Sequence, residues 1–173
     1  MAGFLRHDCQ LYFTGFGARQ IRNGLRATLP LVLVDAASRQ SVSIRAELDG
    51  DAPTVAADRV QVQQVLMNLM LNGNEAMKHT GGELTIRSKK TEDRQVLLSV
   101  RRCGCGLPGE NADLVFDAFF TTKAQGTGMG LSICRRIIES HGGRLWACAN
   151  AARGTIFHFT LPIAVSTSST SAG

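Results

Sequence analysis

The sequence predicts one α+β domain that extends from about residue 41 to residue 163. Two kinds of segment indicate this class: short runs with a two-residue apolar period, typical of half-buried strands, and longer runs with apolar residues every three or four positions, typical of amphipathic helices. Their order along the chain is strand, helix, hairpin, helix and two more strands. The length of 173 residues suits a single domain.

The composition indicates a globular protein, with 44% hydrophobic and 19% charged residues. No apolar run approaches the ~20 residues of a membrane helix, and the first residues lack the pattern of a secretory signal. We therefore expect a soluble, cytoplasmic protein. The net charge of +5 favours anionic partners. The five cysteines are not spaced as in a zinc site or a disulfide framework.

The two ends of the chain are predicted to lie outside the folded domain. Residues 1–17 show no clear period and are expected to form a poorly ordered arm. Residues 164–173 are almost all Ser, Thr, Ala and Gly, which cannot bury enough surface to fold, so we expect a disordered tail. A helix is predicted over residues 18–39, kinked by Pro30, and a strand over residues 41–48.

A second helix, predicted over residues 58–78, carries the most informative pattern. Asp58 is a suitable N-cap, and an apolar stripe along the helix is predicted to face the core. The opposite stripe is polar at spacings of three and four, so its side chains line one face: Gln61, Gln64, Asn68, Asn72 and Glu75. A polar stripe is usually no more than a solvated surface, and it gains meaning only in combination with other motifs.

Two glycine-rich loops, over residues 103–109 and 126–130, are the other notable feature. The second loop directly precedes a predicted helix, where backbone amides and the helix dipole can bind phosphate oxygens. The remaining predicted elements are strands over 83–89 and 95–101, a short apolar segment over 115–120, a helix over 131–140, and strands over 144–149 and 155–161.

Four motifs occur in a fixed order: Asn68-Leu-Met-Leu-Asn72-Gly-Asn-Glu-Ala, Gly104-Cys-Gly106-Leu-Pro, Phe116-Asp-Ala-Phe119-Phe120-Thr-Thr-Lys123, and Gly126-Thr-Gly128-Met-Gly130-Leu. This series resembles the N, G1, F and G2 boxes of the catalytic, ATP-binding domain of sensor histidine kinases, within the gyrase, Hsp90 and MutL-like ATPases. The resemblance implies that residues 18–163 form a Bergerat ATP-binding fold. That fold is a two-layer α/β sandwich whose mixed, mostly antiparallel sheet is covered on one face by helices.

The resemblance also implies that ATP and Mg²⁺ are the cofactors. Asn72 matches the asparagine whose amide oxygen coordinates Mg²⁺, a cation that prefers oxygen ligands. Lys123 is expected to pair with the terminal phosphate, and Thr155 to lie near the adenine, although either could be an ordinary loop or strand residue. The full set implied to bind the nucleotide is Asn72, Glu75, Arg102, Gly104, Gly106, Thr122, Lys123, Gly126, Thr127, Gly128, Met129, Gly130, Leu131 and Thr155.

Asn68 and Lys123 are the residues implied to be catalytic. In the ATP-hydrolysing relatives, a glutamate that activates water occupies the position of Asn68, and an amide cannot serve as that base. Phosphate transfer is therefore expected rather than hydrolysis.

Arg102 departs from the family pattern. The G1 box normally has an aspartate at this position, and its carboxylate accepts a hydrogen bond from the adenine amino group. Arginine has only donors, so a buried adenine amine would lose its partner at a cost of about 1–3 kcal/mol. We therefore expect ATP to bind roughly ten- to a hundredfold more weakly. Asn74 is a second irregularity, because the family usually has an apolar residue there.

The predicted function is that of the ATP-binding domain of a two-component sensor kinase, which passes the γ-phosphate to a histidine on a partner domain. His7 is not expected to be that histidine, so the dimerisation domain is expected in trans or missing from this chain, with a response regulator downstream. The alternatives are a pseudokinase weakened by Arg102, or a serine kinase of the anti-sigma-factor type. Nucleic acid is not expected as a partner, because the basic residues form no aromatic-interleaved stripe.

Overall fold

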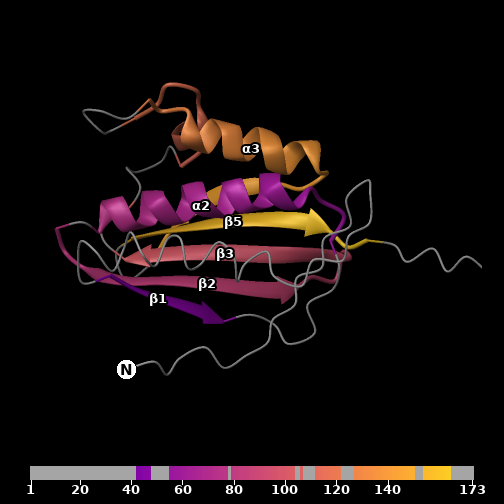
Figure 1. Cartoon of the computed structure of the whole chain (residues 1–173), viewed down its shortest axis with the longest axis horizontal. Coiled ribbons are helices and arrows are strands. Elements are labelled where there is room, and N and C mark those ends of the chain that lie inside the picture. The colour runs from indigo at the N-terminus through magenta and orange to yellow at the C-terminus, as the bar shows by residue number, and fades with distance from the viewer. Residues whose placement is uncertain are drawn as a thin grey trace, which may run out of the picture.

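The computed structural model describes residues 42–47, 55–77, 79–103, 106, 112–121, 127–150 and 154–164. Its centre is a five-stranded sheet in the order β1-β2-β3-β5-β4 (Figure 1). The strands are β1 (Val42–Glu47), β2 (Gly82–Lys90), β3 (Gln95–Cys103), β4 (Leu145–Ala149) and β5 (Gly154–Pro162). Strand β1 is parallel to β2, and every other pair is antiparallel. The predicted mixed, mostly antiparallel sheet is confirmed.

Two helices, α2 (Arg59–Ala76) and α3 (Gly130–Ser140), cover one face of this sheet (Figure 1). A short 3₁₀ turn, η1 (Leu114–Phe116), takes the place of the predicted apolar segment. The two-layer α/β sandwich is therefore confirmed. No helix in the described part of the chain is long and apolar enough to cross a membrane.

The start of α2 is joined to the end of α3. The Oδ1 atom of Asp58 accepts a hydrogen bond from the backbone N–H of Gln61 over 2.9 Å, which confirms the predicted N-cap. The backbone N–H of Asp58 itself donates to Nε2 of His141 over 3.0 Å. Since His141 is the C-cap residue of α3, this bond fixes one helix end against the other.

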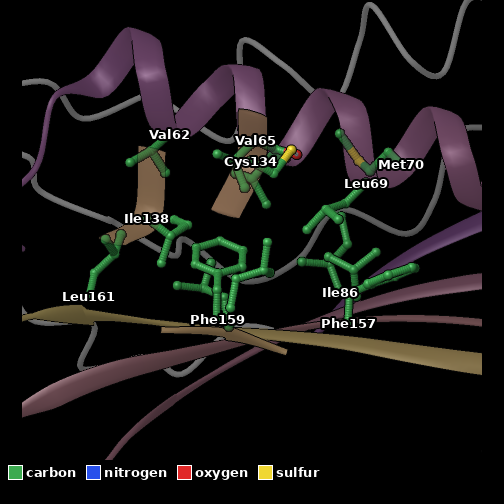
Figure 2. Close-up of a cluster of buried hydrophobic side chains, with 14 of the residues drawn as sticks. Val62, Val65, Leu69, Met70, Ile86, Cys134, Ile138, Phe157, Phe159 and Leu161 are labelled. Carbon is green, nitrogen blue, oxygen red and sulfur yellow. Dashed lines mark hydrogen bonds between the residues drawn. The ribbon is translucent and has the colours of Figure 1, made fainter. Parts of the chain in front are cut away.

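The core lies between the helices and the sheet (Figure 2). Phe157, Phe159 and Leu161 alternate along β5 and all point toward the helices, as the two-residue period predicts. Ile138 of α3 packs against them. The side chains of α2 that Figure 2 labels in this layer are Val62, Val65, Leu69 and Met70. Burying an apolar side chain of this size contributes about 1.5–3 kcal/mol.

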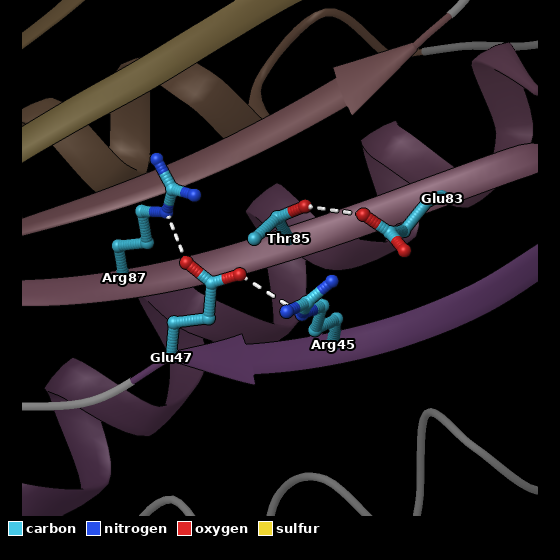
Figure 3. Close-up of polar contacts among 5 residues, drawn as sticks. All are labelled: Arg45, Glu47, Glu83, Thr85 and Arg87. Atoms are coloured by element: carbon cyan, nitrogen blue, oxygen red, sulfur yellow. Dashed lines mark hydrogen bonds and ion pairs between the residues drawn. The ribbon is translucent and has the colours of Figure 1, made fainter.

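The opposite face of β1 and β2 is polar (Figure 3). Glu47 accepts from Nε of Arg45 over 2.9 Å and from Nε of Arg87 over 2.6 Å. The hydrogen bond from Arg87 lowers the pKa of the Glu47 carboxyl. On the same strand as Arg87, the Thr85 hydroxyl donates to Glu83 over 3.1 Å. Because these ion pairs are largely exposed, they contribute little to stability.

Several predicted segments lie outside the described residues. They are the arm over residues 1–17, the kinked helix over residues 18–39, and the tail over residues 164–173 apart from its first residue. The domain boundaries therefore stay a prediction.

Candidate functional site

The polar stripe of α2 contacts α3 at Asn68. Asn68 and Asn72 are half-buried, whereas Glu75 is exposed. The amide Nδ2 of Asn68 donates to Sγ of Cys134, in α3, over 3.6 Å. This contact holds the Asn68 side chain against the second helix, so the stripe is more than a solvated surface at this position.

Cys134 is a partner that the sequence analysis did not assign. Its thiol is buried, and burial raises its pKa to about 11, so the group is neutral at neutral pH. The thiol donates weakly to the backbone oxygen of Val65 over 4.0 Å. The spacing of Leu131, Cys134 and Ile138 along α3 could have placed this cysteine in the core. It could not have shown that Asn68 lies beside it.

Arg102 and Thr155 form a pair between the end of β3 and the start of β5. They are direct partners in the antiparallel register of β3 and β5. The guanidinium Nη2 of Arg102 donates to Oγ1 of Thr155 over 2.9 Å. Thr155 is fully buried, so its hydroxyl is held away from water.

Gly154 makes this pairing possible. Its φ is +139°, and a Cβ atom there would be 2.1 Å from the backbone oxygen of Arg102. Only glycine fits so close an approach in that conformation. Gly106, of the first glycine-rich loop, lies beside it, because a Cβ on Gly106 would be 3.5 Å from the Gly154 oxygen. Gly106 and the beginning of β5 therefore meet next to Thr155.

The three phenylalanines of the F motif have different environments. Phe116 is buried, packs edge-on against Phe157 with ring centroids 6.3 Å apart, and lies 5.1 Å below the guanidinium of Arg135. Phe120 is half-buried against the core. Phe119 is 75% exposed and has a positive φ of 70°. The motif is therefore anchored through Phe116, and Phe119 is presented at the surface.

The second glycine loop leads directly into α3. Gly128 has a φ of +66°, Met129 is exposed, and Gly130 begins the helix. The N-cap residue of α3, Met129, makes no side-chain hydrogen bond to the first turn of the helix. That turn contains no acidic residue. The first N–H groups of a helix have no partner within it, and the helix dipole makes this end positive. An anion is the group that suits such an end.

Comparison with known proteins identifies the family. The family model of histidine kinase-, DNA gyrase B- and HSP90-like ATPases matches residues 57–165, which is most of the chain. The chain belongs to this family. Within the family, the domain is a histidine kinase catalytic domain, because the similar proteins are sensor proteins and a histidine kinase catalytic domain. The identification from four sequence motifs is thus confirmed.

Two of the similar proteins are FixL and ThkA. The sensor protein FixL of Bradyrhizobium diazoefficiens is 46% identical over 129 residues, which are 74% of this chain and 26% of FixL. This histidine kinase domain therefore spans about a quarter of that relative's length. The solved catalytic domain of the histidine kinase ThkA is 36% identical, with a TM-score of 0.69, and the match covers 82% of this chain and 93% of that one.

Two further solved structures contain a ligand or a partner. Full-length ShkA in complex with AMPPNP is 25% identical with a TM-score of 0.71, and the match covers 82% of this chain and 30% of ShkA. ThkA in complex with the response regulator TrrA is 34% identical with a TM-score of 0.66, over 81% of this chain and 40% of that one.

The predicted site residues of the histidine kinase domain fall into three described groups. The first is on α2, with Asn68, Asn72 and Glu75. The second consists of Arg102, Gly106 and Thr155, which Gly154 brings together. The third is the start of α3, with Thr127, Gly128, Met129, Gly130 and Leu131. Gly104, Thr122, Lys123 and Gly126 lie outside the described residues, so their roles stay predictions.

Proposed function

We propose that this domain binds Mg-ATP and transfers the γ-phosphate to a histidine on a partner dimerisation domain. The observation that carries the proposal is the start of α3, where a glycine turn with a φ of +66° at Gly128 precedes an eleven-residue helix with no side-chain cap. That end suits the phosphates of a nucleotide. Family membership and the AMPPNP complex of the similar ShkA support the same choice of ligand.

Asn72 and Glu75 would hold the magnesium ion together with the phosphates. Both supply oxygen atoms, which Mg²⁺ prefers, and they lie on one side of α2. Within the described ranges, no group of three or more His, Cys, Asp or Glu residues could hold a metal ion. This donor set fits an ion held mainly by substrate phosphates and water, with few protein ligands. When bound, the ion would neutralise charge on the phosphates.

The base would lie against the second group, formed by Arg102, Gly106 and Thr155, with Gly104 of the same loop beside it. The phosphates would extend to Thr127, Gly128 and the first N–H groups of α3. Lys123 and Thr122 would join them from the preceding loop, and Lys123 would stabilise charge on the terminal phosphate. Catalysis would then depend mainly on positioning.

Asn68 supports phosphate transfer rather than hydrolysis. Its amide is held by Cys134 Sγ over 3.6 Å, and an amide cannot remove a proton from water. Transfer needs no such base on this chain, because the acceptor imidazole is itself a nucleophile. A response regulator would receive the phosphate next, as the ThkA–TrrA complex suggests by analogy. Because ATP is a cytoplasmic metabolite, we propose that the domain acts in the cytoplasm.

The test mixes the purified chain with a separately purified, histidine-bearing dimerisation domain of a sensor kinase, Mg²⁺ and ATP labelled on the γ-phosphate. We expect the partner domain to become labelled. The label should be lost in acid, as phosphohistidine is, and should not form when magnesium is chelated. Asn72→Ala should reduce labelling at least about tenfold. Gln64→Ala, an exposed position on the same helix, is the matched control and should leave it unchanged. Acid-stable label would instead indicate a serine kinase, and the absence of any label would refute the transfer.

A further inference from the structure

We propose that the base subsite of this domain favours a 6-oxopurine over the 6-aminopurine of ATP, and that Arg102 sets this preference. The inference rests on the proposed function, because it requires the base to lie against Arg102 and Thr155. It would make guanosine and inosine triphosphates better ligands than ATP for the base subsite, while the phosphate contacts stay common to all three.

The Arg102–Thr155 pair is fixed by the fold. The two residues are register partners in neighbouring strands, Gly154 allows the strands to approach there, and Thr155 is fully buried. The hydrogen bond from Arg102 Nη2 to Thr155 Oγ1 is 2.9 Å long. The side chain of Arg102 is therefore directed toward Thr155, close to where Gly106 lies beside the start of β5.

Within this pair, Arg102 can act only as a hydrogen-bond donor. A guanidinium has five N–H groups and no acceptor. The Thr155 oxygen uses one of its two lone pairs to accept from Arg102, and its own hydroxyl proton stays available for donation. Arg102 therefore presents no acceptor for the amino group at C6 of adenine, and that group would lose the partner that a carboxylate at this position would supply.

A 6-oxopurine reverses this mismatch. Its O6 and N7 atoms are both acceptors, and a guanidinium can donate to the two together, which is the commonest specific contact of arginine with guanine in nucleic acids. In adenine, N7 is still an acceptor but the group at C6 is a donor. The two bases should therefore differ in affinity by roughly ten- to a hundredfold at such a site.

The experiment is a calorimetric titration of the chain with Mg-ATP and, separately, with Mg-ITP, whose base carries oxygen in place of the amino group. Arg102→Gln and Arg102→Asp each introduce an acceptor, and the first keeps the folding risk low. Arg101→Gln is the matched control, because strand alternation places its side chain on the other face of β3. Mg-GTP tests whether the preference extends to guanine.

We expect ITP to bind the unmodified chain at least about tenfold more tightly than ATP. Both Arg102 variants should lower the ratio of the ITP affinity to the ATP affinity by a similar factor or more. Arg101→Gln should leave this ratio unchanged. Equal or tighter binding of ATP to the unmodified chain would overturn the inference, as would a ratio that the Arg102 variants leave unchanged. If only the variants bind, and they bind ATP, Arg102 blocks the subsite and the preference is refuted while the nucleotide site stands. If no variant binds any triphosphate, the proposed function itself fails.

Discussion

The backbone of Phe119 lies directly against Gly128. A Cβ atom on Gly128 would be 2.5 Å from the carbonyl carbon of Phe119, and both residues have a positive φ, 70° at Phe119 and +66° at Gly128. Phe119 of the F motif and Gly128 of the glycine turn before α3 therefore meet. This contact places the exposed Phe119 next to the helix end that we propose binds phosphate.

Replacing Gly128 by alanine should weaken this contact. The left-handed backbone alone costs a non-glycine residue about 1–3 kcal/mol, and the added methyl group would clash with Phe119. We expect a loss of this size or more in the free energy of unfolding, measured by urea denaturation. Gly130→Ala is the matched control, because a Cβ there meets nothing within 4 Å, and we expect no loss or a gain of up to about 1 kcal/mol. Equal effects of the two substitutions would contradict this account.

The hydroxyl of Thr155 is predicted to stabilise the fold by accepting from Arg102. Thr155→Val keeps the shape of the side chain but removes the acceptor, so it should lower the free energy of unfolding by about 1–2 kcal/mol. Thr155→Ser, which keeps the hydroxyl, should restore most of this stability. The two variants can be compared by thermal and urea unfolding. If the Thr155→Val variant is as stable as the parent chain, the hydrogen bond makes no net contribution to the free energy of unfolding.

Two phenylalanines offer a direct test of the core. Phe159 is fully buried, so Phe159→Ala should cost about 3–5 kcal/mol through lost transfer energy and the cavity left behind. Phe119 is 75% exposed, and Phe119→Ala should change the free energy of unfolding by less than about 0.5 kcal/mol. Denaturant unfolding of both variants provides the measurement. A large loss at Phe119 would mean that its side chain is buried in solution.

His158 should make stability depend on pH. Its ring lies 2.8 Å from Ser99 Oγ and 3.3 Å from Cys148 Sγ, and it stacks on Trp146 with centroids 5.3 Å apart. Burial lowers the pKa of the His158 imidazole below its ordinary value of 6.5. The folded state therefore favours the neutral ring. Its contribution to stability is complete above the unfolded pKa and is lost as the pH falls through the folded pKa.

The measurement is urea unfolding of the parent chain and of His158→Gln at about pH 8, 6.5 and 5. The parent should lose more stability than the variant on the acid side of 6.5. Parallel curves for the two proteins would show that another group causes the acid sensitivity.

The sequence alone was sufficient for the fold class and for most of the elements. The apolar periods predicted α2, α3 and the five strands of the described sheet, and the N-cap at Asp58 was also predicted. These features depend on neighbours within a few residues, so the sequence is enough to predict them. The order of four short motifs was also sufficient for the family, since each motif is local and their combination is specific. The identity of Arg102 as a residue without acceptors was likewise visible from the sequence.

Only the tertiary structure decided which distant residues meet. Asn68 contacts Cys134 across 66 positions, and Arg102 donates to Thr155 across 53. The first contact depends on how two helices pack, and the second on the register of two strands that are not consecutive in the chain. No period in the sequence encodes either relation, because both arise from packing between elements. The sequence determined which residue types are available to a nucleotide, and the packing decided that Arg102 donates to Thr155.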